Sequence, residues 1–354
     1  MYGISIFLSE EMTNDTRAYI KMMHDVGFKG IFTSLHIPED DATLYAKRLR
    51  ELGQIAQEMN MKLMVDISGE ALKRAGFSFQ QLDEILAIGV TGLRMDYAIS
   101  NKEIAEASKQ LTIGLNASTI TENDVKELKN FHADFRNFEA WHNYYPRPET
   151  GLSSRFFNEK NTWLKQSGFK VFAFVSGNEQ RRGPLYEGLP TLEKHRNENP
   201  FFAALDLAEN FQVDGIYIGD PQLSSRTITQ FKAYENEQVL AIEVANSGSA
   251  YYPLILGNHI NRQDEARDVI RSAQARFKKV ETIKPEAVME RKIGSVTIDN
   301  VNYGRYMGEI QVTKKDLPEN QKINVVAHVV PADCSLLKLI GAGRNFKLIE
   351  KGIL

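Results

Sequence analysis

Four acidic residues stand where short apolar segments end or open into loops. Asp66, Asp96 and Asp220 each close an apolar run, and Glu139 follows Phe138 at the start of a long polar loop. Two acids on either side of a sugar ring can supply the general acid and the base or nucleophile of glycoside hydrolysis, about 5 Å apart for retention and about 6.5–9.5 Å apart for inversion. Each acid also has a structural interpretation, as a helix N-cap or the partner of a nearby arginine. We take all four acids as candidate catalytic residues.

Other polar side chains stand at the same expected strand ends and could contact a ligand. Arg94 lies two residues before Asp96, so both side chains would lie on one side of a strand, and an ion pair between them is the structural interpretation. Glu10 and Glu11 follow the first apolar segment. The candidate ligand-binding residues among these strand ends are His36, Arg94, Asn116 and Ser176.

A long loop, residues 138–153, concentrates aromatic, amide and basic side chains between an apolar segment and a helical one. Two prolines fix its local backbone and remove hydrogen-bond donors. Long loops in compact domains often carry function. The structural alternative is a surface loop whose aromatic side chains pack beneath it. We predict a ligand site, with Trp141, Asn143, Tyr145 and Arg147 as candidate residues.

A second loop, residues 177–196, is rich in glycine and proline and is locally basic. Barrels often hold phosphate near the loops after their seventh and eighth strands. Arginine binds phosphate bidentately, whereas lysine acts as a point charge. The alternative is an exposed lid whose charges are only solvated. Candidate anion-binding residues are Arg181, Arg182 and His195, with Lys194 and Arg196 beside them.

Strand-like and helical segments alternate through the first two-thirds of the chain, and the helical ones carry apolar stripes. Thr121 and Asp124 resemble a capping box, and Asn199-Pro200 resembles an N-cap followed by proline at the first helical position. About eight βα units over residues 1–235 predict a (β/α)8 barrel, with a doubly wound open sheet as the alternative. The chemistry of such a barrel lies at the carboxyl ends of its strands.

Residues 236–354 follow a different pattern of short β-rich segments separated by turns, which predicts a small separate β-barrel domain. Only residues 263–277 read as a helix there. On that helix Asp264, Arg267 and Arg271 would share one face. A solvated or interdomain salt-bridged face is the structural interpretation. The functional interpretation is an anion clamp that reaches the barrel or a neighbouring subunit.

Composition limits the kind of partner. The chain has 354 residues, a formal net charge of −3 and scattered basic residues, which argues against nucleic acid or anionic membrane as partners. A single cysteine, Cys334, rules out an intramolecular disulfide and a cysteine-cluster metal site, and the seven histidines lack paired ligand spacing. We expect no metal and no cofactor. Without a signal-like N-terminus or a membrane-length apolar run, we expect a cytoplasmic protein with a small soluble ligand.

Three motifs in this order resemble the 6-phospho-N-acetylmuramidase (MupG-like) family, formerly labelled outer surface proteins. They are residues 143–153 (NYYPRPETGLS), 182–193 (RGPLYEGLPTLE) and 261–272 (NRQDEARDVIRS). The resemblance covers essentially the whole chain. It implies a TIM barrel of glycosidase type, followed by a cyclophilin-like β-barrel. It also implies hydrolysis of 6-phospho-N-acetylmuramyl-β-1,4-N-acetylglucosamine during cell-wall recycling, so that the partner would be a phosphorylated amino-sugar disaccharide.

The resemblance and the strand-end acids together suggest roles for the candidate residues. One acid would protonate the departing N-acetylglucosamine O4, with its pKa raised by an apolar wall such as Trp141 or by a second acid. The second acid would attack the anomeric carbon, activate water or orient the 2-acetamido group of the substrate. Stacking on a sugar face would fall to Trp141 and Tyr145. The candidates for the 6-phosphate or the lactyl carboxylate are Arg147, Arg181, Arg182 and His195.

Two other classes of function stay open at this point. An isomerase, epimerase or aldolase acting on a phosphosugar would use the same basic loop, although no lysine ends a predicted strand where a Schiff base would form. A non-catalytic phosphosugar-binding protein would keep the arginines and would not need paired acids. Homodimerisation through the β-barrel or through a face of the (β/α)8 barrel is a further hypothesis.

Overall fold

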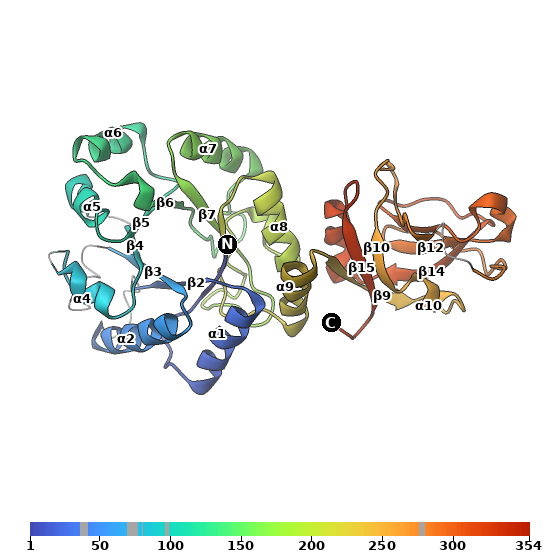
Figure 1. Ribbon diagram of the computed structural model, residues 1–354, viewed down its shortest axis with the longest axis horizontal. Coiled ribbons are helices and arrows are strands. Elements are labelled where there is room, and N and C mark those ends of the chain that lie inside the picture. The colour runs from blue at the N-terminus through green and yellow to red at the C-terminus, as the bar shows by residue number, and fades with distance from the viewer. Residues whose placement is uncertain (36–41, 69–76, 80, 96–98, 276–279) are drawn as a thin grey trace. The chain divides into compact units, whose positions relative to one another are not determined.

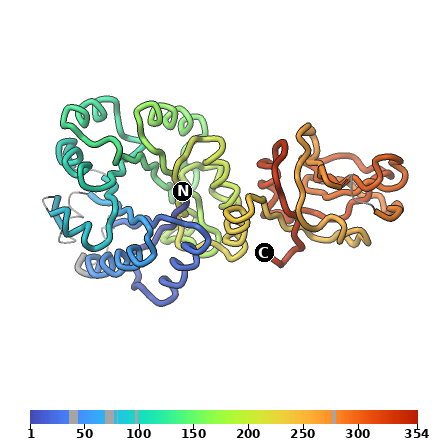
Figure 2. The backbone as a smooth tube through the Cα atoms, viewed as in Figure 1, coloured from blue at the N-terminus to red at the C-terminus, as the bar shows by residue number. Residues whose placement is uncertain are grey.

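The computed structural model describes residues 1–354 except 36–41, 69–76, 80, 96–98 and 276–279. It divides into two compact units, Met1–Ser224 and Ser225–Leu354, which are treated separately below. Figure 1 shows the elements of each unit, and Figure 2 traces the chain from blue at the N-terminus to red at the C-terminus. Two residues of the expected site, His36 and Asp96, lie outside the described residues.

The first unit is a closed barrel of eight parallel strands, with neighbours in chain order and β1 paired to β8. This confirms the predicted (β/α)8 architecture and overturns the open-sheet alternative, because an open sheet would leave β1 and β8 as unpaired edges. The strands are β1 (Tyr2–Ser5), β2 (Gly30–Ser34), β3 (Lys62–Ile67), β4 (Gly92–Met95), β5 (Thr112–Asn116), β6 (Phe138–Trp141), β7 (Lys170–Val175) and β8 (Gly215–Ile218).

The helices of this unit surround the strands (Figure 1). Local signals fix their starts: Thr121 and Asp124 form the predicted capping box, and Asn199 caps a helix whose first residue is Pro200. No helix in the described part of the chain is long and apolar enough to cross a membrane. The helices are α1 (Asn14–Val26), α2 (Ala42–Glu58), α4 (Leu82–Ala87), α5 (Asn101–Ala107), α6 (Glu122–Asn130), α7 (Ser154–Gln166) and α8 (Pro200–Asn210).

Large aromatic side chains form a buried cluster in the core. Trp141 stacks on Phe172 with ring centroids 4.5 Å apart and lies 4.7 Å from the Tyr217 ring. A Cβ atom at Gly3 or Gly30 would collide with Tyr217, so glycine at these positions makes room for that ring. Because side chains fill the interior, a ligand must bind at the mouth, where the loops leave the carboxyl ends of the strands.

The second unit contains a seven-stranded sheet in the order β10-β15-β9-β14-β12-β13-β11. Among the strands described for this unit, β15 pairs in parallel with β9, and the other neighbours are antiparallel. The cyclophilin-like character expected from the family resemblance stays a prediction. The strands are β9 (Leu240–Asn246), β10 (Gly257–Ile260), β11 (Val269–Arg271), β12 (Ser295–Asp299), β13 (Ile310–Thr313), β14 (Ile323–Val329) and β15 (Asn345–Glu350), with α10 (Tyr252–Ile255) between β9 and β10.

Helix α9 (Ser225–Glu237) groups with the second unit, whereas the sequence had suggested a boundary after residue 235. Its buried polar contacts explain the grouping. Arg226 pairs with Glu243 at 2.9 Å, and the Gln230 amide donates to Asp333 at 2.9 Å and to the Ala241 carbonyl at 3.0 Å. These partners all lie in the second unit, so α9 is a folded part of it.

The helix predicted over residues 263–277 is wrong for the part that the structure describes. Residues 269–271 form β11, which pairs antiparallel with β13 in the register Ile270↔Val312. The β-branched pair Val269 and Ile270 favours a strand, and the tertiary pairing overrides the helical spacing of the charged residues. Arg267 consequently pairs with Asp268 and is separated from the Asp264–Arg271 ion pair.

Candidate functional site

A buried ion pair lies at the carboxyl ends of neighbouring barrel strands. Arg94 of β4 donates from Nη1 to Asp66 Oδ1 of β3 at 2.6 Å. Ser34 of β2 donates to the other oxygen of Asp66 at 3.0 Å, and Arg94 Nη2 donates to the side-chain oxygen of Asn143 in the loop after β6. The structure thus brings together Asp66, Arg94 and Asn143, three residues singled out from the sequence. It fixes the Asp66 carboxylate from two sides.

A second polar contact joins the loops that follow β6 and β7 at this mouth. Arg182 of the β7–α8 loop donates from Nη1 to the Tyr144 hydroxyl at 2.9 Å, and its guanidinium lies 4.0 Å over the ring of Phe7. The Tyr144 ring packs edge-on against Phe174. Burial raises the pKa of Tyr144, and the charge of nearby Asp66 adds to that rise while Arg182 opposes it. Tyr144 therefore lies within electrostatic reach of both the Asp66 cluster and Arg182.

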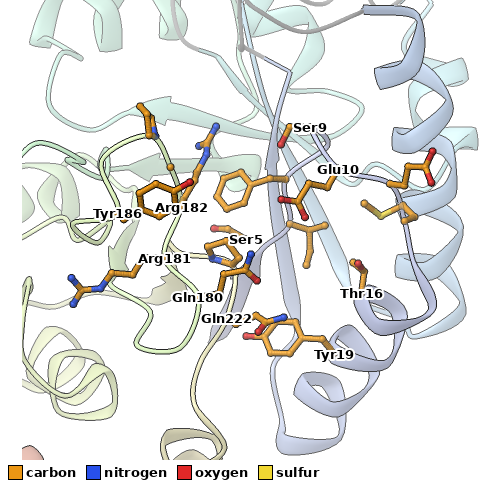
Figure 3. Close-up of a pocket in the computed structure, with 17 residues that line it drawn as sticks. Ser5, Ser9, Glu10, Thr16, Tyr19, Gln180, Arg181, Arg182, Tyr186 and Gln222 are labelled. Atoms are coloured by element: carbon orange, nitrogen blue, oxygen red, sulfur yellow. The ribbon is translucent and has the colours of Figure 1, made fainter.

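A pocket of about 430 Å³ opens beside Arg182 between the loops that follow β1, β7 and β8 (Figure 3). Glu10 and Glu11 line it from the β1 loop, and Arg181, Arg182 and Tyr186 line it from the β7 loop. Opposite charges from different loops therefore face one cavity. This is the arrangement expected for a polar ligand that carries its own charge.

Tyr186 was not identified from the sequence. Its side chain is exposed (64%), and its backbone has a φ of 56°, which is uncommon for a bulky aromatic residue. The aromatic ring therefore lines the pocket instead of packing into the core. The sequence placed Glu10 and Glu11 at the end of the first strand but did not identify them as site residues. Their position after β1, in a barrel whose β7 loop is basic, is the sequence signal for this pocket.

Asp220 anchors the β7–α8 loop. Its buried carboxylate accepts backbone N–H bonds from Gly177 at 2.8 Å, Arg182 at 3.0 Å and Leu189 at 3.0 Å. Three such bonds occupy the carboxylate and fix the loop that carries both pocket arginines. The geometry gives Asp220 a positioning role, which does not favour its assignment as a catalytic acid.

Glu139 and Trp141 lie deeper in the barrel than a catalytic pair, which would lie at the barrel mouth. Trp141 donates to Glu139 at 2.9 Å, and both residues are buried, Trp141 completely. Burial raises the pKa of Glu139, and the hydrogen bond from Trp141 opposes the rise. The charges of Lys62 and Lys170, which begin their strands at the amino end of the barrel, also oppose it. Because Trp141 is enclosed by the core aromatics, its burial does not favour the sugar-stacking role predicted for it.

His195 is buried in the loop and is not exposed to bind phosphate. Its Nε2 lies 2.7 Å from Asp206 Oδ2 of α8, and Lys194 pairs with the same carboxylate at 2.6 Å. Burial lowers the pKa of His195, which favours the neutral ring. These contacts tie the loop to α8 and do not favour the anion-binding role predicted for His195. Arg196 is likewise buried and pairs with Glu193 at 2.6 Å.

The remaining candidates are spread around the mouth. Asn116 accepts the backbone N–H of Ser118 at 3.0 Å and lines a separate hollow of about 170 Å³. The hydroxyl of Ser176 is buried and has no hydrogen-bond partner in the described part of the chain. Tyr145 is half-buried and Arg147 is exposed, and neither lines the 430 Å³ pocket. Among the described residues, no group of three or more His, Cys, Asp or Glu side chains could hold a metal ion.

Solved structures of similar proteins cover the whole chain. A conserved Enterococcus faecalis protein of unknown function is 56% identical, with a TM-score of 0.94 and coverage of 99% of this chain and 97% of its own. An uncharacterised B. cereus protein at 24% identity has a TM-score of 0.76 and 99% coverage of both chains, which shows a shared fold. Comparison with curated proteins finds no match.

Family models account for both units. The model described as 6-phospho-N-acetylmuramidase, N-terminal, matches residues 2–233, and the model described as 6-phospho-N-acetylmuramidase, C-terminal, matches residues 238–349. Together they span nearly the full chain in the order that the sequence motifs had suggested. The chain belongs to the 6-phospho-N-acetylmuramidase (MupG) family.

Proposed function

We propose that the barrel is a glycoside hydrolase that cleaves 6-phospho-N-acetylmuramyl-β-1,4-N-acetylglucosamine into N-acetylmuramic acid 6-phosphate and N-acetylglucosamine, within cell-wall recycling. The observation that carries this proposal is the polar pocket at the barrel mouth, where arginines face acids. Through Tyr144, which Arg182 contacts and Asp66 influences electrostatically, this pocket is linked to the fixed Asp66 carboxylate. Family membership supplies the substrate class. The reaction is a hydrolysis and needs no cofactor.

We assign the phosphate to Arg181 and Arg182. Arg182 is already held by the Tyr144 hydroxyl, by the Phe7 ring and through its own backbone N–H by Asp220. A guanidinium fixed in this way loses little side-chain entropy when it binds a phosphate bidentately. Arg181 is half-buried in the same pocket wall. The exposed Arg147 remains a candidate for the lactyl carboxylate.

We assign the sugar-stacking role to Tyr186, and Tyr145, which does not line this pocket, stays a second candidate. Tyr186 belongs to the same loop as Arg181 and Arg182, and its ring lines the pocket. The apolar face of this ring can contact the C–H groups of a sugar ring. This assignment replaces Trp141.

Asp66 is our candidate for the second acid, the carboxylate that acts at the anomeric carbon of the scissile bond. Ser34 and Arg94 orient it, so that it can attack the anomeric carbon, activate a water or orient the 2-acetamido group. The proton for the leaving N-acetylglucosamine O4 would come from Asp96, or from Glu10 in the pocket wall. Glu139 and Asp220 have the structural roles described above.

Incubation of the purified full chain with the disaccharide, with and without the 6-phosphate, tests the proposal. Free N-acetylglucosamine is followed by mass spectrometry. We expect release only from the phosphorylated substrate, and Arg182→Gln should raise KM by about 10-fold to 100-fold, since a charge-assisted contact contributes roughly 1.5–3 kcal/mol. The matched control is Arg155→Gln, which removes an exposed arginine of α7. Release from neither disaccharide would contradict the proposal and favour a phosphosugar isomerase or binding protein.

A further inference from the structure

Two asparagine side chains lie at the barrel mouth, Asn116 at the end of β5 and Asn143 in the loop after β6. The side-chain oxygen of Asn143 accepts a hydrogen bond from Arg94 Nη2, and that of Asn116 accepts the Ser118 N–H at 3.0 Å. Because each oxygen already has a donor, the orientation of each amide is fixed and its NH2 group faces away from that donor. In the described part of the chain, neither NH2 group donates a hydrogen bond. Both groups can therefore donate to a ligand.

Sheet register places the two asparagines on the interior side of the barrel wall. Asn116 lies opposite Trp141, and Asn143 follows Trp141 by two residues, which is the spacing of side chains that share one side of an extended chain. A Cβ atom at Gly114, two residues before Asn116, would lie 2.9 Å from Trp141 and 3.2 Å from Arg94 Cβ. This side of β5 therefore faces the barrel interior, and the contact of Asn143 with Arg94 shows that Asn143 faces it too.

The charge beside the two amides is compensated. Arg94 donates to Asp66 at 2.6 Å, and both side chains are buried. In contrast, Arg182 in the 430 Å³ pocket has no carboxylate partner among the described residues, and its side chain contacts the Tyr144 hydroxyl and the Phe7 ring. An unpaired guanidinium suits an anion, whereas amide NH2 groups beside a compensated ion pair suit neutral oxygen acceptors such as hydroxyl and amide carbonyl groups.

Strand order places the two amides away from the phosphate-binding pocket. That pocket is lined from the loops after β1, β7 and β8, whereas the amides belong to β5 and the loop after β6. Asp66 is on β3, between β1 and β5 along the closed barrel. A disaccharide whose phosphate lies at Arg182 and whose scissile bond lies at Asp66 would extend its second sugar toward β5. In the proposed substrate the second sugar is N-acetylglucosamine, which carries hydroxyl groups and an acetamido carbonyl but no charge.

We propose that Asn116 and Asn143 bind the uncharged leaving sugar by donating their side-chain N–H groups to its acetamido carbonyl and hydroxyl oxygens. Both would determine specificity for that sugar. Arg94 would act as a positioning residue, because it holds the Asn143 amide and the Asp66 carboxylate at once. This inference rests on the proposed glycosidase function.

Titration of the isotope-labelled full chain by NMR tests this subsite. N-acetylglucosamine is the probe, and N-acetylmuramic acid 6-phosphate reports on the phosphate-binding pocket. The variants Asn116→Asp and Asn143→Asp keep the acceptor oxygen for Ser118 or Arg94 and remove only the NH2 donors. Each variant also identifies the NMR signal of the NH2 group that it deletes. We expect saturable shifts of both signals with N-acetylglucosamine.

The affinities of the variants separate a ligand contact from a structural effect. Asn116→Asp and Asn143→Asp should each weaken N-acetylglucosamine binding about tenfold, about 1.4 kcal/mol, and change the affinity for N-acetylmuramic acid 6-phosphate by less than about threefold. Asn116→Asp decides the outcome alone if Asn143→Asp fails to fold. The matched control is Asn123→Asp on α6, which removes an exposed NH2 group that donates to Glu127 at 2.9 Å and should leave both affinities unchanged.

Three results would overturn the proposal: no saturation by about 50 mM N-acetylglucosamine, equal weakening of both ligands in the two variants, or an equal loss in Asn123→Asp. Disaccharide turnover distinguishes these results from failure of the proposed function. Turnover with unchanged KM and kcat in Asn116→Asp and Asn143→Asp would remove the subsite and leave the hydrolase. N-acetylglucosamine binding that the two variants weaken, in a chain that turns over neither disaccharide, would support the subsite and remove the hydrolase.

Discussion

The two units place their charged groups by different means. At the barrel mouth the pocket residues come from loops, and buried anchors hold those loops: Asp220 binds three backbone N–H groups, and His195 lies against Asp206. In the second unit the charged residues Arg271, Glu309 and Asp299 belong to adjoining strands or their ends, and the sheet register sets their spacing.

This difference indicates which properties each site can have. A loop-built pocket can combine residues from distant parts of the chain and can adjust when a substrate binds, but it depends on its anchors. Charged groups on paired strands keep the spacing that the sheet register sets, because a register slip would move every side chain of the strand to the other face. The loops at the barrel mouth can therefore adapt to a large ligand, whereas the sheet of the second unit keeps its charged groups at fixed spacing.

The largest expected effect is the difference in kcat between a substitution at the barrel mouth and one in the barrel interior. Asp66→Asn should lower kcat by roughly 10²–10⁴-fold, because the carboxylate that would act at the anomeric carbon becomes a neutral amide. Glu139→Gln should leave kcat within about threefold, because Glu139 bonds to Trp141 inside the barrel. Steady-state kinetics with the phosphorylated disaccharide measure both. Loss of turnover in Glu139→Gln with normal turnover in Asp66→Asn would reverse the assignment.

The next effect is an opposite pH dependence of stability in the two units. Burial lowers the pKa of His142 in the barrel to about 4, so the folded barrel binds fewer protons than the unfolded chain below pH 6.5, and stability falls as the pH falls from 6.5 to about 4. Burial raises the pKa of Asp299 to about 7, and the charge of Glu309 adds to that rise, so the folded second unit binds more protons above pH 3.8, and stability falls as the pH rises from 3.8 to about 7. Each contribution is roughly 2–4 kcal/mol.

Hydrogen exchange of the two units, measured from pH 4 to 7, distinguishes these slopes. The variant Asp299→Asn should flatten the pH dependence of the second unit and leave that of the barrel unchanged. Slopes of the same sign in both units would contradict the expectation.

A smaller effect compares two buried anchors, Asp220 in the barrel and Asn261 in the second unit, where the Asn261 side-chain oxygen accepts the Arg271 N–H at 3.0 Å. Asp220→Asn and Asn261→Ala should each lower the free energy of unfolding by about 1–3 kcal/mol, because each leaves buried backbone groups poorly paired. Only Asp220→Asn should also raise KM for the disaccharide, since Asp220 holds the loop that carries Arg182. Chemical denaturation and kinetics measure the two properties. A normal KM in Asp220→Asn would show that the loop keeps its position without this anchor.

Much of the fold could be predicted from the sequence because its signals are local. Strand–helix alternation and caps such as Thr121 and Asn199 depend on neighbouring residues, and the barrel follows from their repetition. The site was predicted less well. An acid at a strand end could face the mouth, as Asp66 does, or the interior, as Glu139 does, and only packing around Trp141 separates the two. Likewise, charged residues at helical spacing around Arg271 gave no sign that β13 would pair with that segment.

The smallest expected effect concerns exposed ion pairs, one from each unit. Arg155 pairs with Glu159 on α7, and Arg267 pairs with Asp268 before β11, with both arginine side chains more than 80% exposed. Solvent and salt screen such pairs, so Arg155→Gln and Arg267→Gln should each change the free energy of unfolding by less than about 0.5 kcal/mol. Arg155 does not line the 430 Å³ pocket, so disaccharide turnover by Arg155→Gln should be unchanged. A measurable loss of turnover in Arg155→Gln would mean that surface charge steers the disaccharide over a longer range than the pocket implies.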